Sequence, residues 1–298
     1  MRPWVGKGGN VSPLDLLWLY FILASLQPLI QQRVLALRRV KALHALERRN
    51  RSRAITLIHR REGLAILGIP FGGYIDIDDS EAVIRAIEMT APSMPIDLVL
   101  HTPGGLVLAA EQIASALAGH KGQVTVYVPH YAMSGGTLIA LAGDRIVLAP
   151  SAVLGPVDPQ LGEYPAASIL AAVGQKDPNE TDDKTLIMAD VARKAQVQVR
   201  GFVTQLLRRH LDDAHAEEVA TKLSEGRWTH DFPIDAELAR SFGLKVDTDL
   251  PDEVRLLMRL YPQPRNRRPS VEYIPVPYQA PAREPARRAP PTRPANKG

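Results

Sequence analysis

Short strand-forming segments alternate with amphipathic helical segments through most of this 298-residue chain. Strands joined by helices predict crossover connections and a mostly parallel sheet with both faces covered, which is an α/β fold. The chemistry of such a fold is expected beyond the carboxyl ends of its strands. The expected strands are 55–60, 96–102, 123–128 and 145–149, and the expected helices are 80–90, 105–120 and 134–143.

The chain is predicted to have three regions. Residues 1–53 combine an apolar run with a basic helical pattern, and residues 54–261 form the α/β domain. Residues 262–298 hold ten of the 25 prolines and few aliphatic residues. A segment of that composition buries too little surface to offset its ordering entropy, so we expect a disordered tail.

The first region contains an apolar run of fifteen residues without a charge, 16–30. About 20 apolar residues are needed to cross a bilayer as a helix, so this run is short. We expect an uncleaved N-terminal membrane anchor followed by a juxtamembrane helix. Eight basic residues between Arg33 and Arg53 predict that the following domain lies on the cytoplasmic side. The alternatives are an interfacial or re-entrant helix, a buried or subunit-joining helix, and an extracytoplasmic domain.

Composition narrows the chemistry and the partners. The chain has no cysteine, which excludes disulfides, thiolate zinc sites and cysteine nucleophiles. Its net charge of +4 comes from basic residues at the two ends of the chain, and the middle is nearly neutral. Basicity is therefore not a property of the α/β domain, and we expect no nucleic-acid partner.

Two glycine pairs follow expected strands: HTPGGLV at 101–107 and HYAMSGGT at 130–137. Backbone N–H groups at such turns, beside a helix N-terminus, can stabilise negative charge that develops on a carbonyl oxygen. The second turn adds the hydroxyl of Ser134. From spacing alone an ordinary N-cap serine is the better interpretation, and a nucleophile is the alternative.

The motifs HTPGG, AMSGGT and AGDRIVLAPSAVLGPVDPQLG, in this order, resemble the serine peptidases of the ClpP/crotonase fold. The resemblance covers about residues 55–250 and is greatest to peptidases similar to signal peptide peptidase A and to the serine dehydrogenase proteinase family. It implies a repeated β-β-α superhelix, a homo-oligomer and no cofactor. It also implies Ser134 as nucleophile, Gly105 and Gly135 as oxyanion-hole backbone, and Thr102, Pro103 and Gly104 as the binding site for the substrate main chain.

The proton acceptor for Ser134 is less clear from the residues. ClpP itself uses a histidine after the serine, but no histidine occurs between Tyr131 and Arg209. Signal peptide peptidase A uses a lysine, and the segment 174–195 resembles its lysine-bearing region. Lys176 matches best, with Lys184 and Lys194 as alternatives. A lysine acts as a base only if burial lowers its pKa, so this prediction requires a desolvated amine.

Several other polar residues are expected to have structural roles. His101 and His130 are expected to line the site or end strands, and Asp158 to organise a loop. His210, His215 and His230 lack the compact spacing of a metal site, so no metal is expected.

The function predicted from these residues is a membrane-anchored serine endopeptidase that cleaves peptide or protein substrates through a Ser–Lys dyad and an acyl-enzyme. A crotonase-like acyl-CoA enzyme, in which Ser134 is incidental, and a non-catalytic membrane scaffold are the alternatives.

Overall fold

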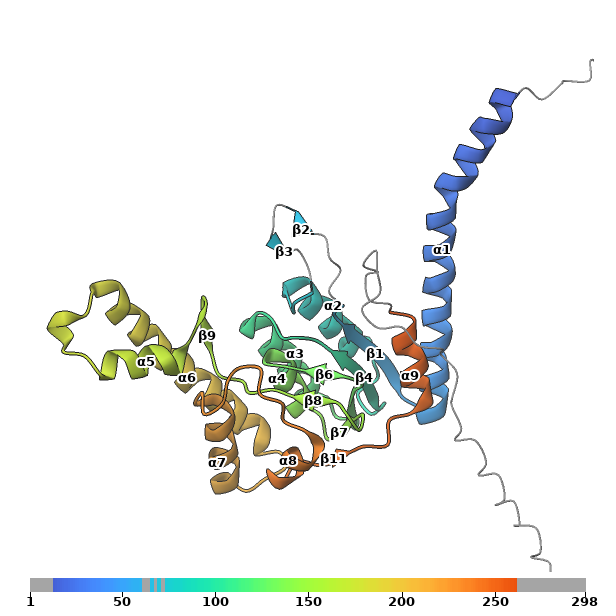
Figure 1. Ribbon diagram of the computed structural model, residues 1–298. Coiled ribbons are helices and arrows are strands. Elements are labelled where there is room, and N and C mark those ends of the chain that lie inside the picture. The colour runs from blue at the N-terminus through green and yellow to red at the C-terminus, as the bar shows by residue number, and fades with distance from the viewer. Residues whose placement is uncertain (1–12, 61–64, 67–68, 71–72, 262–298) are drawn as a thin grey trace, which may run out of the picture. The chain divides into compact units, whose positions relative to one another are not determined.

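The computed structural model describes residues 13–60, 65–66, 69–70 and 73–261. Its centre is a five-stranded sheet in the order β1-β4-β5-β7-β11, and every neighbouring pair in it is parallel (Figure 1). The strands are β1 (Arg53–Ile58), β4 (Ile96–His101), β5 (Val124–Val128), β7 (Arg145–Leu148) and β11 (Val246–Asp247). The expected parallel sheet is confirmed, with a short fifth strand added at one edge.

Helices lie between the strands, as a parallel sheet requires. The connecting helices are α2 (Ile77–Glu88), α3 (Val107–Gly119), α4 (Gly135–Leu141), α5 (Ala166–Gly174), α6 (Asp183–Leu207), α7 (Asp213–Ser224) and α8 (Ala236–Ser241), with the 3₁₀ turn η1 (Pro178–Glu180). Helix α1 (Pro13–Asn50) precedes β1, and α9 (Asp252–Arg259) follows β11. Three short pairs accompany the sheet: β2 (Ala65–Ile66) with β3 (Ile69–Pro70), β6 (Tyr131–Ala132) with β8 (Val153–Leu154), and β9 (Gln160–Leu161) with β10 (Tyr164–Pro165).

The central strands are mostly apolar because both faces of the sheet are covered. Every residue of β4 and β5 is buried. The one carboxylate among them, Asp97, accepts hydrogen bonds from Asn50 Nδ2 and Ser52 Oγ, which tie the end of α1 to the sheet. Burial raises the pKa of Asp97. Helices α3 and α4 are buried along most of one side, so the turns that precede them are held firmly at the carboxyl edge of the sheet.

Helices α5 and α6 pack against each other as a hairpin (Figure 1). A small apolar cluster of Ala166, Ile169, Ala189 and Ala192 joins them, separate from the main core. The outer side of α6 leaves Ile187, Val191 and Val197 exposed.

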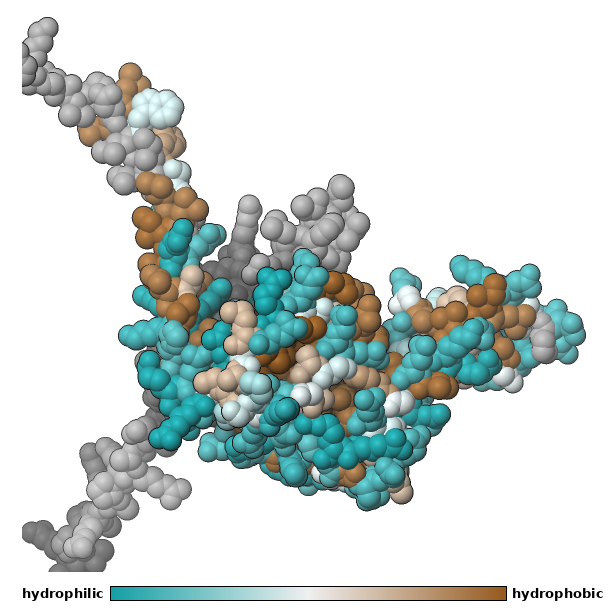
Figure 2. Space-filling view, turned by 180° about the vertical axis from the view of Figure 1, so that it is seen from behind, coloured by the Kyte–Doolittle hydropathy of each residue, from teal (hydrophilic) through white to brown (hydrophobic). Residues whose placement is uncertain are grey.

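Helix α1 is a single helix of 38 residues, and only its last part packs on the domain. Ala42 and Leu46 are buried there, and Arg39 Nε donates to Leu260 O. Upstream, Trp18, Phe21 and other large apolar side chains are exposed. Hydrophobic residues appear in brown along much of α1 in Figure 2.

None of the helices in the described ranges combines enough length with enough apolar character to cross a membrane. The predicted transmembrane helix is therefore not supported. The physical reason is the composition of α1. The apolar run at 16–30 is followed, within the same helix, by Arg33, Arg38 and Arg39. The predicted disordered tail, 262–298, and residues 1–12 lie outside the described residues.

Candidate active site

Ser134 has a backbone conformation that an ordinary helix cap does not have. Its φ is 52° and its ψ is −120°, and its side chain makes no capping hydrogen bond although it stands at the N-cap of α4. Among the described non-glycine residues, only Arg51 shares a positive φ. Such strain typically costs about 1–3 kcal/mol and persists where the surroundings over-determine it. A serine on a sharp turn between a strand and a helix is the geometry that exposes a nucleophilic hydroxyl.

The two glycine turns meet at Ser134. A Cβ added to Gly104 would lie 2.8 Å from Ser134 Cβ and 2.9 Å from Met133 O. A Cβ on Gly136 would lie 2.6 Å from Thr102 Cγ2. Backbone hydrogen bonds join the turns, because Thr102 N donates to Tyr131 O and Met133 N donates to Thr102 O. Glycine is therefore required at both turns for this close approach.

The Gly105 and Gly135 amides lie at the heads of α3 and α4, beside Ser134. A Cβ on Gly135 would lie 3.7 Å from Gly105 N, so the two glycines are neighbours in space. In the described part of the chain, neither N–H donates a turn, loop or cap hydrogen bond. Two free N–H groups near a serine hydroxyl can bind the oxyanion of a tetrahedral intermediate.

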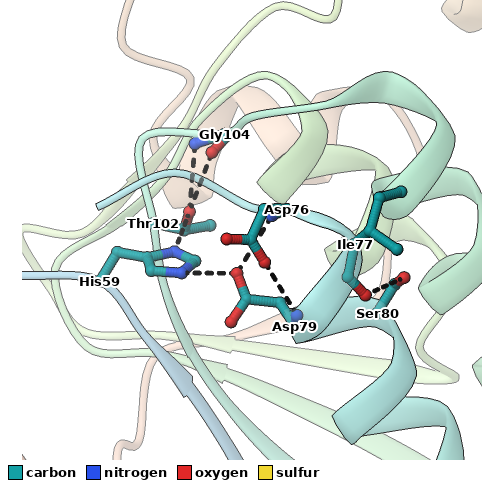
Figure 3. A network of polar contacts seen from close by, with 7 residues as sticks. All are labelled: His59, Asp76, Ile77, Asp79, Ser80, Thr102 and Gly104. Atoms are coloured by element: carbon teal, nitrogen blue, oxygen red, sulfur yellow. Dashed lines mark hydrogen bonds and ion pairs between the residues drawn. The ribbon is translucent and has the colours of Figure 1, made fainter. Parts of the chain in front are cut away.

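A polar network positions the first turn (Figure 3). His59, which follows β1, contacts Thr102 Oγ1 through Nδ1 at 2.8 Å and Asp79 Oδ2 through Nε2 at 3.0 Å. Gly104 N donates to Thr102 Oγ1, and Asp79 and Asp76 form the capping box of α2. Sequence reasoning did not identify His59 or Asp79. The available signal was a histidine near the carboxyl end of the expected strand 55–60, at the edge where the site was expected.

His101, at the end of β4, has no exposed surface. Burial, together with the nearby charges of Arg60 and His130, lowers the pKa of His101 to about 4. Its ring packs on Tyr131 with 4.4 Å between centroids. A neutral, enclosed imidazole of this kind packs inside the domain against Tyr131 and is not accessible to a substrate.

The buried imidazole of His101 is expected to make the fold acid-sensitive. Because its folded pKa lies below the unfolded value of 6.5, its stabilisation is complete above pH 6.5 and is lost as pH falls toward 4. A difference of that size corresponds to about 3 kcal/mol in the free energy of unfolding. Urea unfolding at pH 7 and pH 4.5 measures the loss in the free energy of unfolding. In His101→Leu most of this pH dependence should be absent. An equal loss in wild type and His101→Leu would contradict this assignment.

The three candidate lysines are exposed in the single chain. Lys176 follows α5, Lys184 lies in the first turn of α6, and Lys194 bonds Asp190 one turn earlier on α6 at 2.5 Å. Lys176 lies two residues beyond the last residue of α5, whereas the buried residues of that helix are Ala166 and Ile169. The desolvated amine that the lysine prediction requires is thus not present in the chain by itself.

A groove of about 630 Å³ begins beside the first turn of α3. Most of its lining is apolar, although burial raises the pKa of the Glu111 carboxyl within it. It is lined by Val107, Leu108, Glu111, Pro159, Gln160, Leu161, Ala195, Gln198, Val199, Phe202 and Gln205. Within the residues that the structure describes, no group of three or more potential metal ligands is found.

Comparison with known proteins gives a family match and a similar relative. Residues 9–287 match a family described as ClpP-like SDH-type serine proteinase. The chain is 52% identical over 269 residues to Uncharacterized protein MJ0137 of Methanocaldococcus jannaschii, covering 90% of this chain and 94% of that protein.

Two solved structures are similar at low identity. A mutant of the 1510-N membrane-bound stomatin-specific protease is 21% identical, with a TM-score of 0.42 and coverage of 68% of this chain and 81% of that one. ClpP1 from Listeria monocytogenes is 14% identical, with a TM-score of 0.43 and coverage of 70% and 99%. The family match, which spans nearly the whole chain, shows that this protein is a serine peptidase and belongs to the ClpP-like SDH-type serine proteinases.

Proposed function

We propose that the protein is an endopeptidase in which Ser134 is the nucleophile. The observation that carries this proposal is the strained backbone of Ser134. Its hydroxyl makes no capping hydrogen bond, and the residue lies where the two glycine turns meet. The Ser134 hydroxyl oxygen attacks the peptide carbonyl carbon, its proton passes to a base, and the Gly105 and Gly135 N–H groups hold the oxyanion. The protonated amine leaves, and water then releases the acyl group from Ser134.

The segment Thr102–Pro103–Gly104 is proposed to hold the main chain of the substrate. It runs directly into Gly105, so a peptide bound along it would have its carbonyl next to the oxyanion donors. The His59 and Asp79 network supports this role because it fixes Thr102 and the Gly104 N–H before any substrate arrives. Preorganisation of this kind is what a site needs to stabilise charge in the transition state.

The resemblance to signal peptide peptidase A proposes Lys176 as the base. Because the Lys176 side chain is exposed in the single chain, a Ser–Lys dyad requires a second chain to bury it. A homo-oligomer is proposed on the same ground. The exposed apolar residues Ile187, Val191 and Val197 of α6 offer a surface for that contact.

A fluorophosphonate probe tests the proposal directly, since it reacts only with an activated serine. Wild-type protein should be labelled, and mass spectrometry of the digested product should place the label on Ser134. A label on another serine, or none, would contradict the proposed nucleophile.

The lysine assignment is tested by the same probe on Lys176→Ala, Lys184→Ala and Lys194→Ala. If Lys176 is the base, only the first variant should lose labelling, by about 100-fold or more. Full labelling of Lys176→Ala would exclude the dyad at this position while leaving Ser134 as nucleophile.

A further inference from the structure

The Gly105 N–H belongs to the same peptide unit as the Gly104 carbonyl, and that carbonyl is anchored. Gly104 O accepts a hydrogen bond from Ile75 N, and Ile75 O accepts one from Leu106 N, both at 2.8 Å. This peptide unit is trans, so its N–H points opposite to its C=O and away from Ile75. A Cβ on Gly135 would lie 3.7 Å from Gly105 N. The contact with Ile75 therefore sets the direction of the proposed oxyanion donor.

A second set of contacts holds Gly104 at its own N–H. This N–H donates to Thr102 Oγ1 at 3.2 Å, and the same oxygen lies 2.8 Å from His59 Nδ1. His59 Nε2 lies 3.0 Å from Asp79 Oδ2 (Figure 3). A carboxylate only accepts hydrogen bonds, so Nε2 donates to Asp79 and, in the neutral ring, Nδ1 accepts the Thr102 hydroxyl hydrogen. The Thr102 oxygen then presents its lone pairs to the Gly104 N–H.

The two sets of contacts meet at the head of α2. The Asp79 Oδ2 atom that accepts from His59 also accepts from Asp76 N, at 3.1 Å. Asp76 is the N-cap of α2 and directly follows Ile75. The N–H and the carbonyl of Gly104 are thus both tied to one short segment. Gly104 has a φ of 108° and a permissive backbone, so these hydrogen bonds select its conformation.

The Thr102 hydroxyl has a second acceptor within reach. Thr102 Oγ1 lies 3.4 Å from Gly104 O, whereas its contact with His59 Nδ1 is 2.8 Å. Without His59 the hydroxyl would turn to Gly104 O, which already accepts from Ile75 N. It would then pull the carbonyl toward Thr102 and away from Ile75. The Gly105 N–H in the same peptide unit would rotate with it.

The contacts of His59 fit holding the turn and not removing a proton from Ser134. Both of its ring nitrogens are engaged, and its side chain is 12% exposed. Thr102, to which it bonds, is fully buried. Any effect of His59 on the chemistry therefore passes through Thr102 and the glycine turn.

We propose that His59 and Asp79 are positioning residues for the oxyanion hole, which aim the Gly105 N–H at the carbonyl oxygen of the substrate. This inference rests on the proposed roles of Ser134 and Gly105. As the Ser134 oxygen bonds to the carbonyl carbon, the charge that develops on the carbonyl oxygen meets an N–H whose direction is already fixed. Stabilisation of this kind acts in the transition state, so kcat depends on the pair and KM does not.

His59→Phe tests the inference, with His44→Phe as its matched control. Phenylalanine keeps a ring but removes both polar contacts. His44 makes a similar imidazole–carboxylate contact with Glu47, at 2.9 Å, on α1, and its side chain is 60% exposed. In His59→Phe, kcat for a peptide and the rate of fluorophosphonate labelling should fall about 100-fold with KM little changed, since a misplacement of about 1 Å can cost that much. His44→Phe should match wild type.

Double variants separate positioning from a general loss of structure. If His59 acts through the Gly105 N–H, combining His59→Phe with Gly105→Ala should slow labelling no more than Gly105→Ala alone, because that N–H is already displaced. Thr102→Val, which removes the hydroxyl and keeps the branched shape, should behave in the same way, alone and combined with Gly105→Ala. It decides the question if His59→Phe does not fold. Losses that multiply in the double variants would overturn the inference.

Failure of the proposed function would give a different result. If wild type is not labelled at Ser134, the proposed nucleophile is wrong. If wild type is labelled there and His59→Phe is labelled at the same rate, only the role of His59 and Asp79 is contradicted.

Discussion

Ser134→Ala is expected to abolish fluorophosphonate labelling and to lower peptide hydrolysis on the order of 10⁴-fold or more, because the substitution removes the attacking oxygen. Its fold should survive. The Ser134 side chain makes no capping hydrogen bond, and alanine keeps the Cβ that packs near Gly104. The free energy of unfolding should therefore stay within about 0.5 kcal/mol of wild type. Probe labelling, peptide hydrolysis and urea unfolding measure the three quantities.

Two companion variants sharpen that result. Ser151→Ala, at an exposed serine after β7, should label and cleave as wild type does. Ser134→Gly should be as inactive as Ser134→Ala but more stable than it by about 1 kcal/mol, since glycine relieves the positive φ. Peptide hydrolysis that persists in Ser134→Ala would point to a reaction without a serine nucleophile, as in the crotonase-like alternative.

The parallel sheet and the meeting of the two glycine turns could be predicted from sequence because both follow from local patterns. Each expected strand is a β-branched run, and each glycine pair stands where a strand ends. Parallel strands bring their carboxyl ends to one edge, so HTPGG and AMSGGT had to become neighbours. No such pattern distinguishes a capping serine from a strained one. The φ of 52° at Ser134 arises from packing between turns that are 30 residues apart.

The supporting polar contacts could not be predicted for the same physical reason. His59 meets Asp79 and Thr102 across 20 and 43 residues, and His230 meets Asp158 across 72. Neither pairing leaves a spacing that identifies it. A lone aspartate in GPVDPQ predicts a loop organiser, and only the fold brings His230 to Asp158.

The membrane-anchor prediction for α1 lacks support for a different reason. An apolar run without charges favours a membrane helix, but length decides whether it can span, and this run continues into a basic helix. Its exposed apolar residues and its buried end at Leu46 belong to one helix. The sequence shows both the short run and the basic segment after it, and the structure adds that the two form one continuous helix.

Gly105→Ala is expected to lower labelling of Ser134 by about 100- to 1,000-fold, the usual loss for one oxyanion donor. The added Cβ would overlap the backbone N and O of Ile75 and lie 2.7 Å from its Cα. The turn cannot yield easily, because Ile75 N donates to Gly104 O and Leu106 N donates to Ile75 O, both at 2.8 Å. Movement of the turn would carry the Gly105 N–H away from the oxyanion, and the overpacking should also cost about 1–3 kcal/mol of stability.

Gly119→Ala and Gly174→Ala are the matched controls for that substitution. A Cβ at either glycine meets nothing within 4 Å, and both lie at the ends of helices, α3 and α5. Alanine there should leave labelling unchanged and stabilise the fold by up to about 1 kcal/mol. If Gly105→Ala labels at the rate of these controls while remaining folded, its N–H is not an oxyanion donor. The Gly135 N–H at the head of α4 would then have to hold the charge with a donor other than Gly105, which would separate the nucleophile turn from the HTPGG turn in the mechanism.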